Sequence, residues 1–526
     1  MQKVSEAWKQ AHELPLLPET FIEISVGITD VGARDLVTAT GENEAYFSST
    51  QRIVGDFDVP YGNKYATLEH NFWLLDGSRK VLPDSYPYDA QGYVGSIDEG
   101  CVVLRYDEIR SFPVPGFTIT WSNTFGEYPT AFSVTVQRSG ETIAYKEITD
   151  NTEIISEVAM SVVDYDTVII RVISWNTPNH RARIDRVFYG HMISFGKQDI
   201  LSFTHEQRGD LNSGEIPKNS VEFSLNNVDE IWNPSNSQGL GRYLTERQAV
   251  VVRYGMLLDG AIEWIPAGTF YLSEWRVPSN GMKADFKARD AFEFMLNKPY
   301  KGGKTGTLDY LIENAIGYSD LPDGFTFTIT NAYDDLKKYI ATVPDDKEYT
   351  AAEVIQMCAN AACCVFYQDR GGSLLVDKID NKVTDCVIKS FESYSHPEID
   401  LSKPLKSVTV DYGDKNTFTK SISAAGENQT VKNPLVSTAE QAEEIADWVT
   451  DSLKLRSSVS GDFRPDLMID VFDIITIESK YGAVAPVAIT EIKYSFNGAF
   501  RATYKGRKID GITVLGGFVI GESRLA

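Results

Sequence analysis

The sequence predicts a mainly β, α+β multidomain protein with two related β-barrel-like domains, a small α+β domain and an inserted β-sandwich. Three observations lead to this fold class. A strand–turn–strand pattern occurs twice, residues 46–188 consist of short aromatic-rich strands without a helix, and two helix-capping patterns stand in the C-terminal half. At 526 residues the chain exceeds what one hydrophobic core supports, and roughly three to five domains are expected.

The repeated pattern is a β-hairpin with an Asn-Gly turn. The first copy consists of 272–276 (LSEWR), the turn Asn280-Gly281 and 286–289 (FKAR). The second copy consists of 489–493 (ITEIK), the turn Asn497-Gly498 and 504–507 (YKGR), with one extra residue after the turn. Asn-Gly between alternating runs is a strong hairpin signal, because a type I′ turn needs positive φ at both central residues. Since an apolar strand precedes each copy, we predict the same β topology for 225–300 and 465–508.

Composition limits the classes of function. A net charge of −24 disfavours stable nucleic-acid binding, which depends on neutralising phosphates, and suits a surface past which DNA moves. The sequence holds no apolar run of 18 residues and no apolar segment near its start, so we expect neither a membrane span nor a signal peptide. Its five cysteines form no C-x-x-C pair and are expected to be reduced.

Residues 1–45 are expected to begin the first β domain. Val4, Ala7, Trp8 and Ala11 share one face of a short helix. Because so short a helix is not stable alone, we expect it to dock on its own domain or on a neighbouring subunit. An alternating strand follows at 21–26.

Residues 46–188 are expected to form the inserted β-sandwich, an autonomous module that projects outward. Its predicted strands include 117–121, 132–136, 142–145 and 168–173, and turn residues separate them at regular spacing. A set of strands with its own turns is typical of a sandwich with its own core.

The remaining limits are set by strand and helix patterns. We place the continued first β domain at 189–300, the small α+β domain at 301–400 and the second β domain at 401–526. Capping boxes at Thr350–Glu353 and Thr438–Gln441 each open a predicted helix, one on either side of the limit at 400.

No motif argues for catalysis, a cofactor or a metal. Gly303-Lys304-Thr305 lacks the first glycine of a phosphate-binding loop and the strand that should precede it. His205-Glu206 would need a second histidine at 209 to make a zinc motif, and Gly209 stands there. We therefore predict no catalytic residue, no cofactor-binding residue and no metal ligand.

Aromatic side chains in the sandwich could stack on sugar rings. The candidate glycan contacts are Trp73, Tyr86, Tyr88 and Tyr93, of which Tyr86 and Tyr88 flank a proline in a loop. Trp121, Tyr128 and Trp175 belong to the same wider set. Core packing is the alternative, and about half of such aromatics are expected to be buried.

Several motifs occur in a recognisable order: 4–8 (VSEAW), 216–227 (IPKNSVEFSLNN), 243–248 (YLTERQ), 265–275 (IPAGTFYLSEW) and 473–477 (DIITI). On these motifs the chain resembles the tail hub, or baseplate hub, proteins of phages and prophages of Gram-positive bacteria. The resemblance covers 1–45 and about 189–526.

The inserted segment carries motifs of its own, at 73–77 (WLLDG), 126–129 (GEYP) and 180–186 (HRARIDR). These resemble a jelly-roll insertion seen in some tail proteins, which is similar to galactose-binding-like carbohydrate modules. The calcium-binding pattern of that family is not found in the sequence.

The hub resemblance implies a virion protein at the tail tip. It implies a homotrimer whose two β tube domains per chain form a ring at the distal end of the tail tube, through which DNA and the tape-measure protein pass. Implied neighbours are the distal tail ring protein, receptor-binding proteins or fibres, and a host cell-wall glycan. Some relatives carry a C-terminal peptidoglycan-cleaving domain; this chain ends about twenty residues after the second hairpin, so we expect a non-lytic hub.

Two alternatives and one expectation about charge follow. The first alternative is a carbohydrate-binding adhesin, or receptor-binding tail protein, without a tube role. The second is a cell-wall hydrolase, which no catalytic motif in the sequence supports. If the β domains line a channel, the net charge of −24 predicts a predominantly negative lining. A lining mostly of Lys and Arg would bind phosphates and defeat the DNA-conduit account, even with the hub fold intact.

Overall fold

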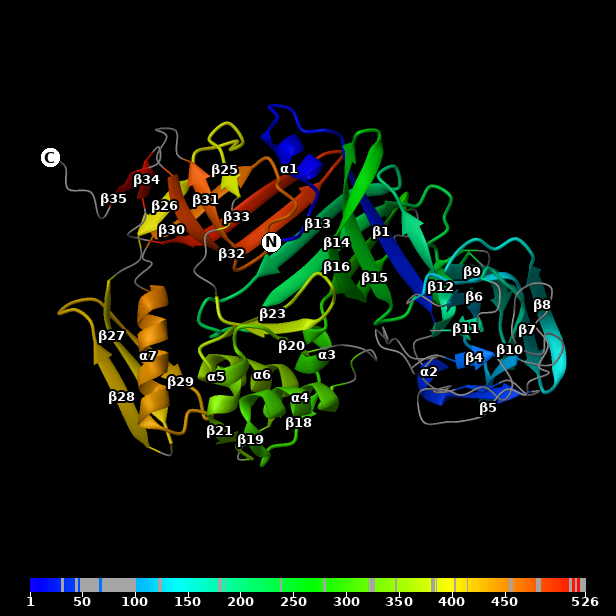
Figure 1. Cartoon of the computed structure of the whole chain (residues 1–526), viewed down its shortest axis with the longest axis horizontal. Coiled ribbons are helices and arrows are strands. Elements are labelled where there is room, and N and C mark those ends of the chain that lie inside the picture. Colours follow the sequence, from blue (N-terminus) through cyan, green and yellow to red (C-terminus); the bar gives the residue numbers. More distant parts are fainter. Residues whose placement is uncertain are drawn as a thin grey trace.

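The computed structural model describes residues 1–29, 33–42, 46–47, 66–68, 101–121, 125–177, 182–184, 186–236, 239–277, 281–319, 321, 327–345, 348–379, 384, 386–401, 404–413, 415–453, 457–478, 484–509, 513–515 and 518–520. The described residues form a mainly β protein with several separate sheets. Figure 1 shows two β units side by side, a helical unit beneath them and a sandwich at one end. Within these ranges no helix is long and apolar enough to cross a membrane.

Eight antiparallel strands form one continuous ribbon, which we call the shared sheet. In order across the sheet they are β26 (Glu398–Leu401), β30 (Ser457–Phe463), β33 (Phe500–Lys508), β32 (Val484–Phe496), β13 (Ile200–Arg208), β14 (Lys218–Asn226), β17 (Lys283–Arg289) and β16 (Ala261–Arg276). The first four strands are the C-terminal β unit, and the last four are the N-terminal β unit. Pairing of β32 with β13 joins the two units, and β26 and β16 lie toward opposite ends of the sheet (Figure 1).

Each β unit folds a second layer against the shared sheet through its longest strand. β16 also pairs with β15 (Ala249–Leu258), which pairs with β1 (Thr20–Thr29). In the same way β32 pairs with β31 (Ile474–Glu478), which pairs with β25 (Val387–Ile388). Large apolar side chains from both units fill one core, among them Trp8, Trp232, Tyr254, Phe270 and Tyr494.

The two predicted hairpins have the same register, including the same irregularity. In the first, Leu272 pairs with Ala288 and Glu274 pairs with Lys287, so Ser273 is an extra residue in β16. In the second, Ile489 pairs with Gly506 and Glu491 pairs with Lys505, so Thr490 is the extra residue. Each bulged hydroxyl donates to the carbonyl of the facing lysine, Ser273 to Lys287 at 3.1 Å and Thr490 to Lys505 at 3.2 Å.

The strand before each hairpin starts from the same backbone conformation. Arg247 and Phe472 have φ values of 70° and 69°, which side chains rarely adopt. The amide of Arg247 donates to the carbonyl of Leu272 at 2.7 Å, and the amide of Phe472 donates to that of Ile489 at 2.8 Å. The predicted repeat is therefore a repeat of strand order, register, bulge and entry turn.

The predicted N-terminal helix is α1 (Glu6–Glu13). Ser5 caps it, since its Oγ accepts from the amide of Trp8 at 3.1 Å, and the same Oγ donates to Glu263 at 2.5 Å. Trp8 is fully buried in the core of the β units. The helix therefore docks on the protein's own β units.

The sandwich has a five-stranded sheet of β2 (Val37–Glu42), β5 (Cys101–Arg110), β10 (Tyr165–Trp175), β7 (Pro129–Arg138) and β8 (Glu141–Ile148). Its other layer consists of β9 (Ile155–Val162), β6 (Val114–Thr120) and the first half of β12 (Arg186–Phe195). Short segments α2 (Ala33–Leu36), β3 (Tyr46–Phe47), β4 (Ala66–Leu68) and β11 (Ala182–Ile184) complete its described part. Apolar residues of both layers, such as Phe117, Phe132 and Val168, form a core separate from that of the β units.

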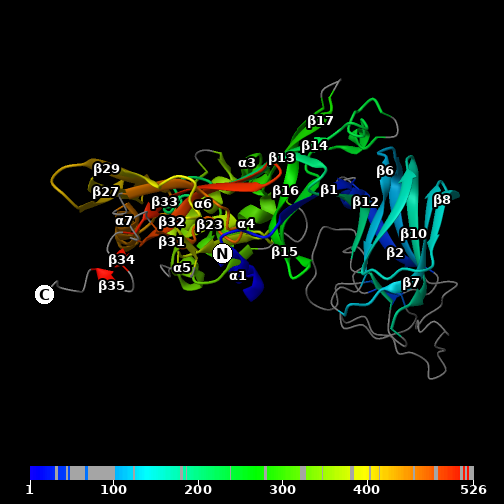
Figure 2. The same cartoon turned by 90° about the horizontal axis from the view of Figure 1, so that it is seen from above.

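One strand connects the sandwich to the rest of the chain. The first half of β12 pairs with β6, and its second half pairs with β1. The chain leaves β1 at Thr29 and returns beside it, because Thr29 and Gly190 are register partners. Ser161 and Tyr243, whose hydroxyls lie 3.1 Å apart, add a contact between sandwich and β unit. Figure 2 shows the sandwich set at one end of the molecule.

The helical unit carries the remaining elements. Its helices are α3 (Phe292–Leu296), α4 (Leu308–Tyr318), α5 (Tyr333–Lys338), α6 (Ala351–Ala361) and α7 (Ala439–Leu453). Its strands are β18 (Pro299–Tyr300), β19 (Thr305–Thr307), β20 (Phe327–Ile329), β21 (Ile340–Thr342), β22 (Tyr349–Thr350), β23 (Val365–Gln368), β24 (Leu374–Asp377), β27 (Leu405–Tyr412), β28 (Asn416–Ser421) and β29 (Glu427–Lys432). The 3₁₀ helix η2 (Gly241–Tyr243) and the strands β34 (Thr513–Leu515) and β35 (Phe518–Ile520) belong to the β units.

The predicted capping boxes open α6 and α7. Thr350 and Glu353 cap reciprocally, with contacts of 2.7 and 3.2 Å. At α7, Thr438 accepts from the amide of Gln441 at 3.2 Å, but the Gln441 side chain accepts from the amide of Ser437 instead.

The core of the helical unit extends beyond the expected limit at 400. The apolar face of α7 and the buried side chains of β27 share this core with α6. In the other direction, β26 begins before that limit and pairs with the C-terminal β unit. Likewise β2 of the sandwich sheet lies before 46. Sequence order and spatial packing therefore differ at these positions.

The position of the sandwich predicts that the rest of the chain folds without it, which a deletion tests. Replacing residues 30–189 by an Asn-Gly turn should leave a soluble, folded remainder, because Thr29 and Gly190 already face each other and the sandwich has its own core. Circular dichroism and a cooperative unfolding transition check the result. As a control, the same turn joined to His191 instead of Gly190 shifts the register by one residue and should destabilise the hairpin. Insoluble protein from the in-register deletion would show that the cores depend on each other.

Candidate functional site

A buried ion pair joins the helical unit to both β units. Arg370 stands in the turn between β23 and β24, its side chain is 1% exposed, and its Nε donates to Asp470 Oδ1 at 2.7 Å. Its Nη1 donates to the carbonyls of Leu467 at 2.8 Å and Pro266 at 3.1 Å, and its Nη2 donates to that of Ile469 at 2.9 Å. Because Pro266 lies in β16 and the other partners precede β31, one side chain binds the backbone of both units.

A buried histidine lies at the strand contact beside this ion pair. His205 on β13 is the register partner of Tyr494 on β32. Its Nε2 lies 2.8 Å from Asn219 Oδ1, and its Nδ1 lies 2.7 Å from the Tyr254 hydroxyl. Since an amide oxygen can only accept, Nε2 donates and Nδ1 accepts from Tyr254. This arrangement fits a neutral imidazole.

Burial and neighbouring charge set the protonation of this cluster. Burial, aided by the positive charge of Arg370, lowers the pKa of His205 to about 4. Burial alone would raise the pKa of Asp470, but the Arg370 guanidinium holds it below its usual value. Burial also opposes the charge on Arg370, whose pKa is nevertheless raised by Asp470. At neutral pH the cluster therefore holds one ion pair and an uncharged imidazole.

Sequence reasoning did not single out Arg370 or Asp470, and it considered His205 only as half of a zinc motif. Arg370 precedes Gly371-Gly372 in a hairpin turn, where a charged residue is ordinarily solvated. The sequence feature that could have indicated the ion pair is a group of three closely spaced aspartates, Asp466, Asp470 and Asp473, before the strand β31. That pattern alone does not name the cation that approaches it.

The solvent-facing side of the shared sheet, which we call the polar face, is rich in charge. Its cations are Arg208, Lys218, Arg276, Lys283, Lys287, Arg289, Lys493, Arg501, Lys505 and Arg507, and its anions are Glu206, Glu222, Glu274, Asp285, Glu398, Asp400, Asp462 and Glu491. Cations outnumber anions here although the chain carries −24. Several are paired, as in Lys287–Glu222 at 3.0 Å and Lys283–Asp285 at 2.9 Å.

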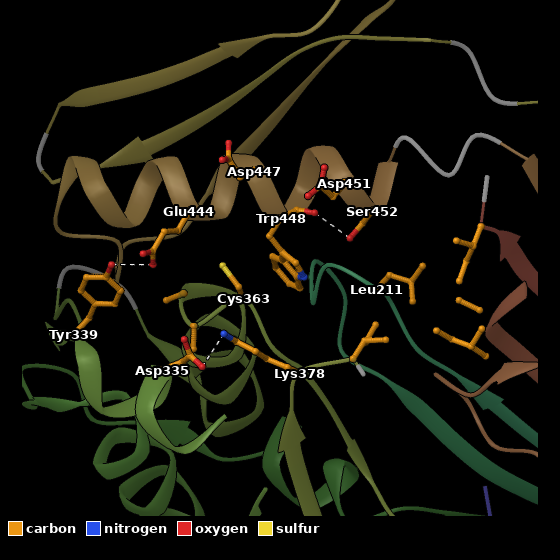
Figure 3. Close-up of a pocket in the computed structure, with 16 residues that line it drawn as sticks. Leu211, Asp335, Tyr339, Cys363, Lys378, Glu444, Asp447, Trp448, Asp451 and Ser452 are labelled. Carbon is orange, nitrogen blue, oxygen red and sulfur yellow. Dashed lines mark hydrogen bonds and ion pairs between the residues drawn. The ribbon is translucent and has the colours of Figure 1, made fainter. Parts of the chain in front are cut away.

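A crevice of about 800 Å³ lies between α7, the rest of the helical unit and the C-terminal β unit. Figure 3 shows Glu444, Asp447 and Asp451 along α7, with Cys363 and Lys378 below the helix. Two of the lining acids have partners: Tyr339 donates to Glu444 at 2.9 Å, and Lys378 lies 2.7 Å from Asp335.

The chemistry of the crevice is that of a packing gap. Burial raises the pKa of the Cys363 thiol to about 12, so it is protonated at neutral pH and a poor nucleophile. Burial also raises the pKa values of Cys358 and Cys364. Among the described residues, no group of three His, Cys, Asp or Glu side chains could hold a metal ion.

The aromatic candidates comprise four residues outside the described ranges, two buried tryptophans and Tyr128, which packs partly buried against the sandwich core. Trp73, Tyr86, Tyr88 and Tyr93 lie outside the described residues. Trp121 and Trp175 are buried in the sandwich core, and the Trp121 Nε1 donates to Ser156 at 2.7 Å. These two tryptophans therefore stabilise the core and present no ring to a ligand.

Comparison with known proteins gives similarity to tail proteins at low identity. No protein-family model and no curated protein matches the sequence. A tail protein from Neisseria meningitidis MC58 is 12% identical, with a TM-score of 0.42 over 62% of this chain and 95% of that chain. The 43 kDa tail protein of prophage MuSo2 from Shewanella oneidensis is 11% identical, with a TM-score of 0.42 over 61% and 96%. The prophage tail protein gp18 from Listeria monocytogenes EGD-e is 12% identical, with a TM-score of 0.41 over 60% and 91%.

The buried ion pair generates a stability prediction. Arg370→Met leaves Asp470 charged and unpaired in the interior, which should cost about 3–5 kcal/mol of unfolding free energy. Adding Asp470→Asn should recover part of this loss, because the double variant buries no charge. Urea unfolding followed by tryptophan fluorescence measures both, since Trp8 and Trp232 are buried in the affected core.

The matched control for Arg370→Met is Lys378→Met. Lys378 pairs with Asp335 at 2.7 Å, but its side chain is 44% exposed, so its loss should cost less than about 1 kcal/mol. Equal costs for Arg370→Met and Lys378→Met would contradict the role assigned to the buried pair.

His205 generates a pH prediction. Its pKa is about 4 in the folded state and about 6.5 when unfolded, so between these values the unfolded chain binds more protons. Stability should therefore fall as pH falls from about 6.5 toward 4, by at most about 1.4 kcal/mol per pH unit from this residue. Asp470, whose folded pKa is lowered, loses its contribution only at lower pH. Unfolding midpoints measured from pH 7 to 4 should vary less in His205→Gln, and an unchanged pH profile would refute the assignment.

Proposed function

We propose that the protein is a structural tail hub of a phage or phage-like particle, a trimeric ring at the distal end of the tail tube. The ring would serve as a DNA conduit and as an attachment platform. The sequence motifs over 1–45 and about 189–526 support this role by their resemblance to hub proteins. The proposed neighbours are the distal tail ring protein, the tape-measure protein and receptor-binding proteins or fibres.

The observation that carries the proposal is the repeated β unit. Strands β13, β14, β17 and β16 correspond in order and register to β26, β30, β33 and β32, and the two sets are joined edge to edge. Three such chains would present six equivalent units to a sixfold tail tube. An adhesin without a tube role has no need for two equivalent units joined in this way.

The charge of the proposed channel differs from the sequence expectation. If the polar face lines the channel, its lining is richer in Lys and Arg than the net charge of −24 predicts. This counts against an acidic wall. The DNA-conduit proposal then rests on charge pairs such as Lys287–Glu222, because a paired cation releases fewer counterions on meeting a phosphate. Retention of DNA by an assembled ring at physiological salt would exclude the conduit.

The sandwich is proposed as the ligand-binding part, with Trp73, Tyr86, Tyr88 and Tyr93 as its glycan contacts. Its separate core and its place at one end of the molecule support a module that can be presented to a host surface (Figure 2). Comparing the deletion variant with the whole chain in a cell-wall binding assay tests this role. If the deletion variant still binds cell walls, the ligand-binding role belongs to another part of the chain.

The trimer is tested by mass in solution. Light scattering of the whole chain over a range of concentrations should reach three times the 58.6 kDa of one chain, and images of the particle should show a ring. The expected cause is edge-to-edge strand pairing between β units. A single-chain mass at every concentration, together with glycan binding, would favour the adhesin instead.

A further inference from the structure

We propose that β26 of one copy pairs with the end of β16 in a second copy, in the register already used by β13 and β32 inside the chain. This inference rests on the ring of the proposed function and names its contact surface. The partner is therefore a second copy of the same chain, joined head to tail.

The template is the internal contact between the two β units. In it Glu206 pairs with Lys493, Gln207 with Ile492, and His205 with Tyr494. In the order across the shared sheet, β32 is the last strand of the C-terminal unit and β13 is the first strand of the N-terminal unit. By the same order, β26 is the first strand of the C-terminal unit and corresponds to β13. The last strand of the N-terminal unit is β16, which corresponds to β32.

The register of the new contact follows from shared partners. Glu206 pairs with Ser220, and Asp400 pairs with Ser458. Ser220 faces Arg289, as Ser458 faces Arg507, and these two arginines are equivalent in the repeated hairpin. Asp400 is therefore the counterpart of Glu206.

On the other strand, Arg276 is the counterpart of Lys493, since each follows the equivalent glutamate of the hairpin by two residues. The template then places Asp400 opposite Arg276. It also places Leu401 opposite Trp275, and Ile399 opposite Val277.

The charges agree with this register. In the internal contact an acid, Glu206, faces a base, Lys493. In the proposed contact an acid, Asp400, faces a base, Arg276, at the equivalent place. Opposite charges directly across two antiparallel strands stabilise the pairing, whereas like charges oppose it.

The exposure of the apolar side chains on β26 also agrees with the proposed contact. His205 and Gln207 are buried by the internal contact. Their counterparts on β26, Ile399 and Leu401, are 59% and 73% exposed in the single chain. Apolar side chains in alternate positions of an edge strand indicate a surface that is covered in the assembly.

Both edges are available for pairing. Among the described residues β26 pairs along one side only, with β30. After Leu272 the end of β16 pairs, within the described ranges, only with β17, because β15 meets β16 no further than Tyr271. Each edge thus presents unpaired backbone groups to one side, which is what a further strand requires.

A disulfide cross-link tests the register in the whole chain. A variant with Arg276→Cys and Asp400→Cys should form covalent multimers under oxidation, seen on a non-reducing denaturing gel and ending at three chains. The control pairs Arg276→Cys with Ile399→Cys, whose side chains would point to opposite faces of the sheet and should not cross-link. Each single-cysteine variant measures the background from native thiols.

Charge reversal tests the same contact without oxidation. Asp400→Arg alone and Arg276→Asp alone should each weaken association, by about fivefold at each contact, because like charges then face each other. The two changes together should restore association. Light scattering gives the mass of each variant.

The outcomes separate this inference from the proposed function. A trimer that neither cross-links at 276 and 400 nor responds to charge reversal overturns the β26–β16 contact and leaves the ring standing. Cross-linking in the control pair instead overturns the register. A chain that stays monomeric at every concentration and never cross-links overturns both the contact and the ring.

Discussion

The guanidinium of Arg370 is the contact on which the arrangement of the β and helical units depends. It is buried, so its charge must be balanced within the protein, and Asp470 together with three backbone carbonyls provides that balance. These partners come from both β units, whereas Arg370 belongs to the helical unit. Because all must meet at one point, these contacts constrain how the helical unit packs on the two β units.

The sequence predicted the local features of this fold better than its long-range contacts. The Asn-Gly turns and alternating runs identified both hairpins, because turn geometry and alternation act over a few residues. The pairing of β13 with β32 joins residues nearly 300 positions apart, and no local pattern marks it. The bulges at Ser273 and Thr490 were equally hidden, since each is a single extra residue inside a regular run.

The candidate site followed the same division. No strand was predicted at Phe203, His205 and Gln207, and burial of a histidine and a glutamine depends on partners contributed by distant segments. Arg370 looked like an ordinary turn residue for the same reason. For Trp121 and Trp175 the sequence could not distinguish a ligand surface from a core, because aromatic residues are suited to both, and the structure buries these two in the sandwich core.

The adjacency of Thr29 and Gly190 has a consequence for how such a protein can change over time. Since entry and exit of the sandwich share one rung of a hairpin, the segment between them can be lengthened, shortened or exchanged without moving any strand of the shared sheet. The strands of the shared sheet and those of the sandwich can thus change independently of each other. Exchange of the segment at this rung would alter the sandwich and leave the pairing of β1 with the second half of β12 intact.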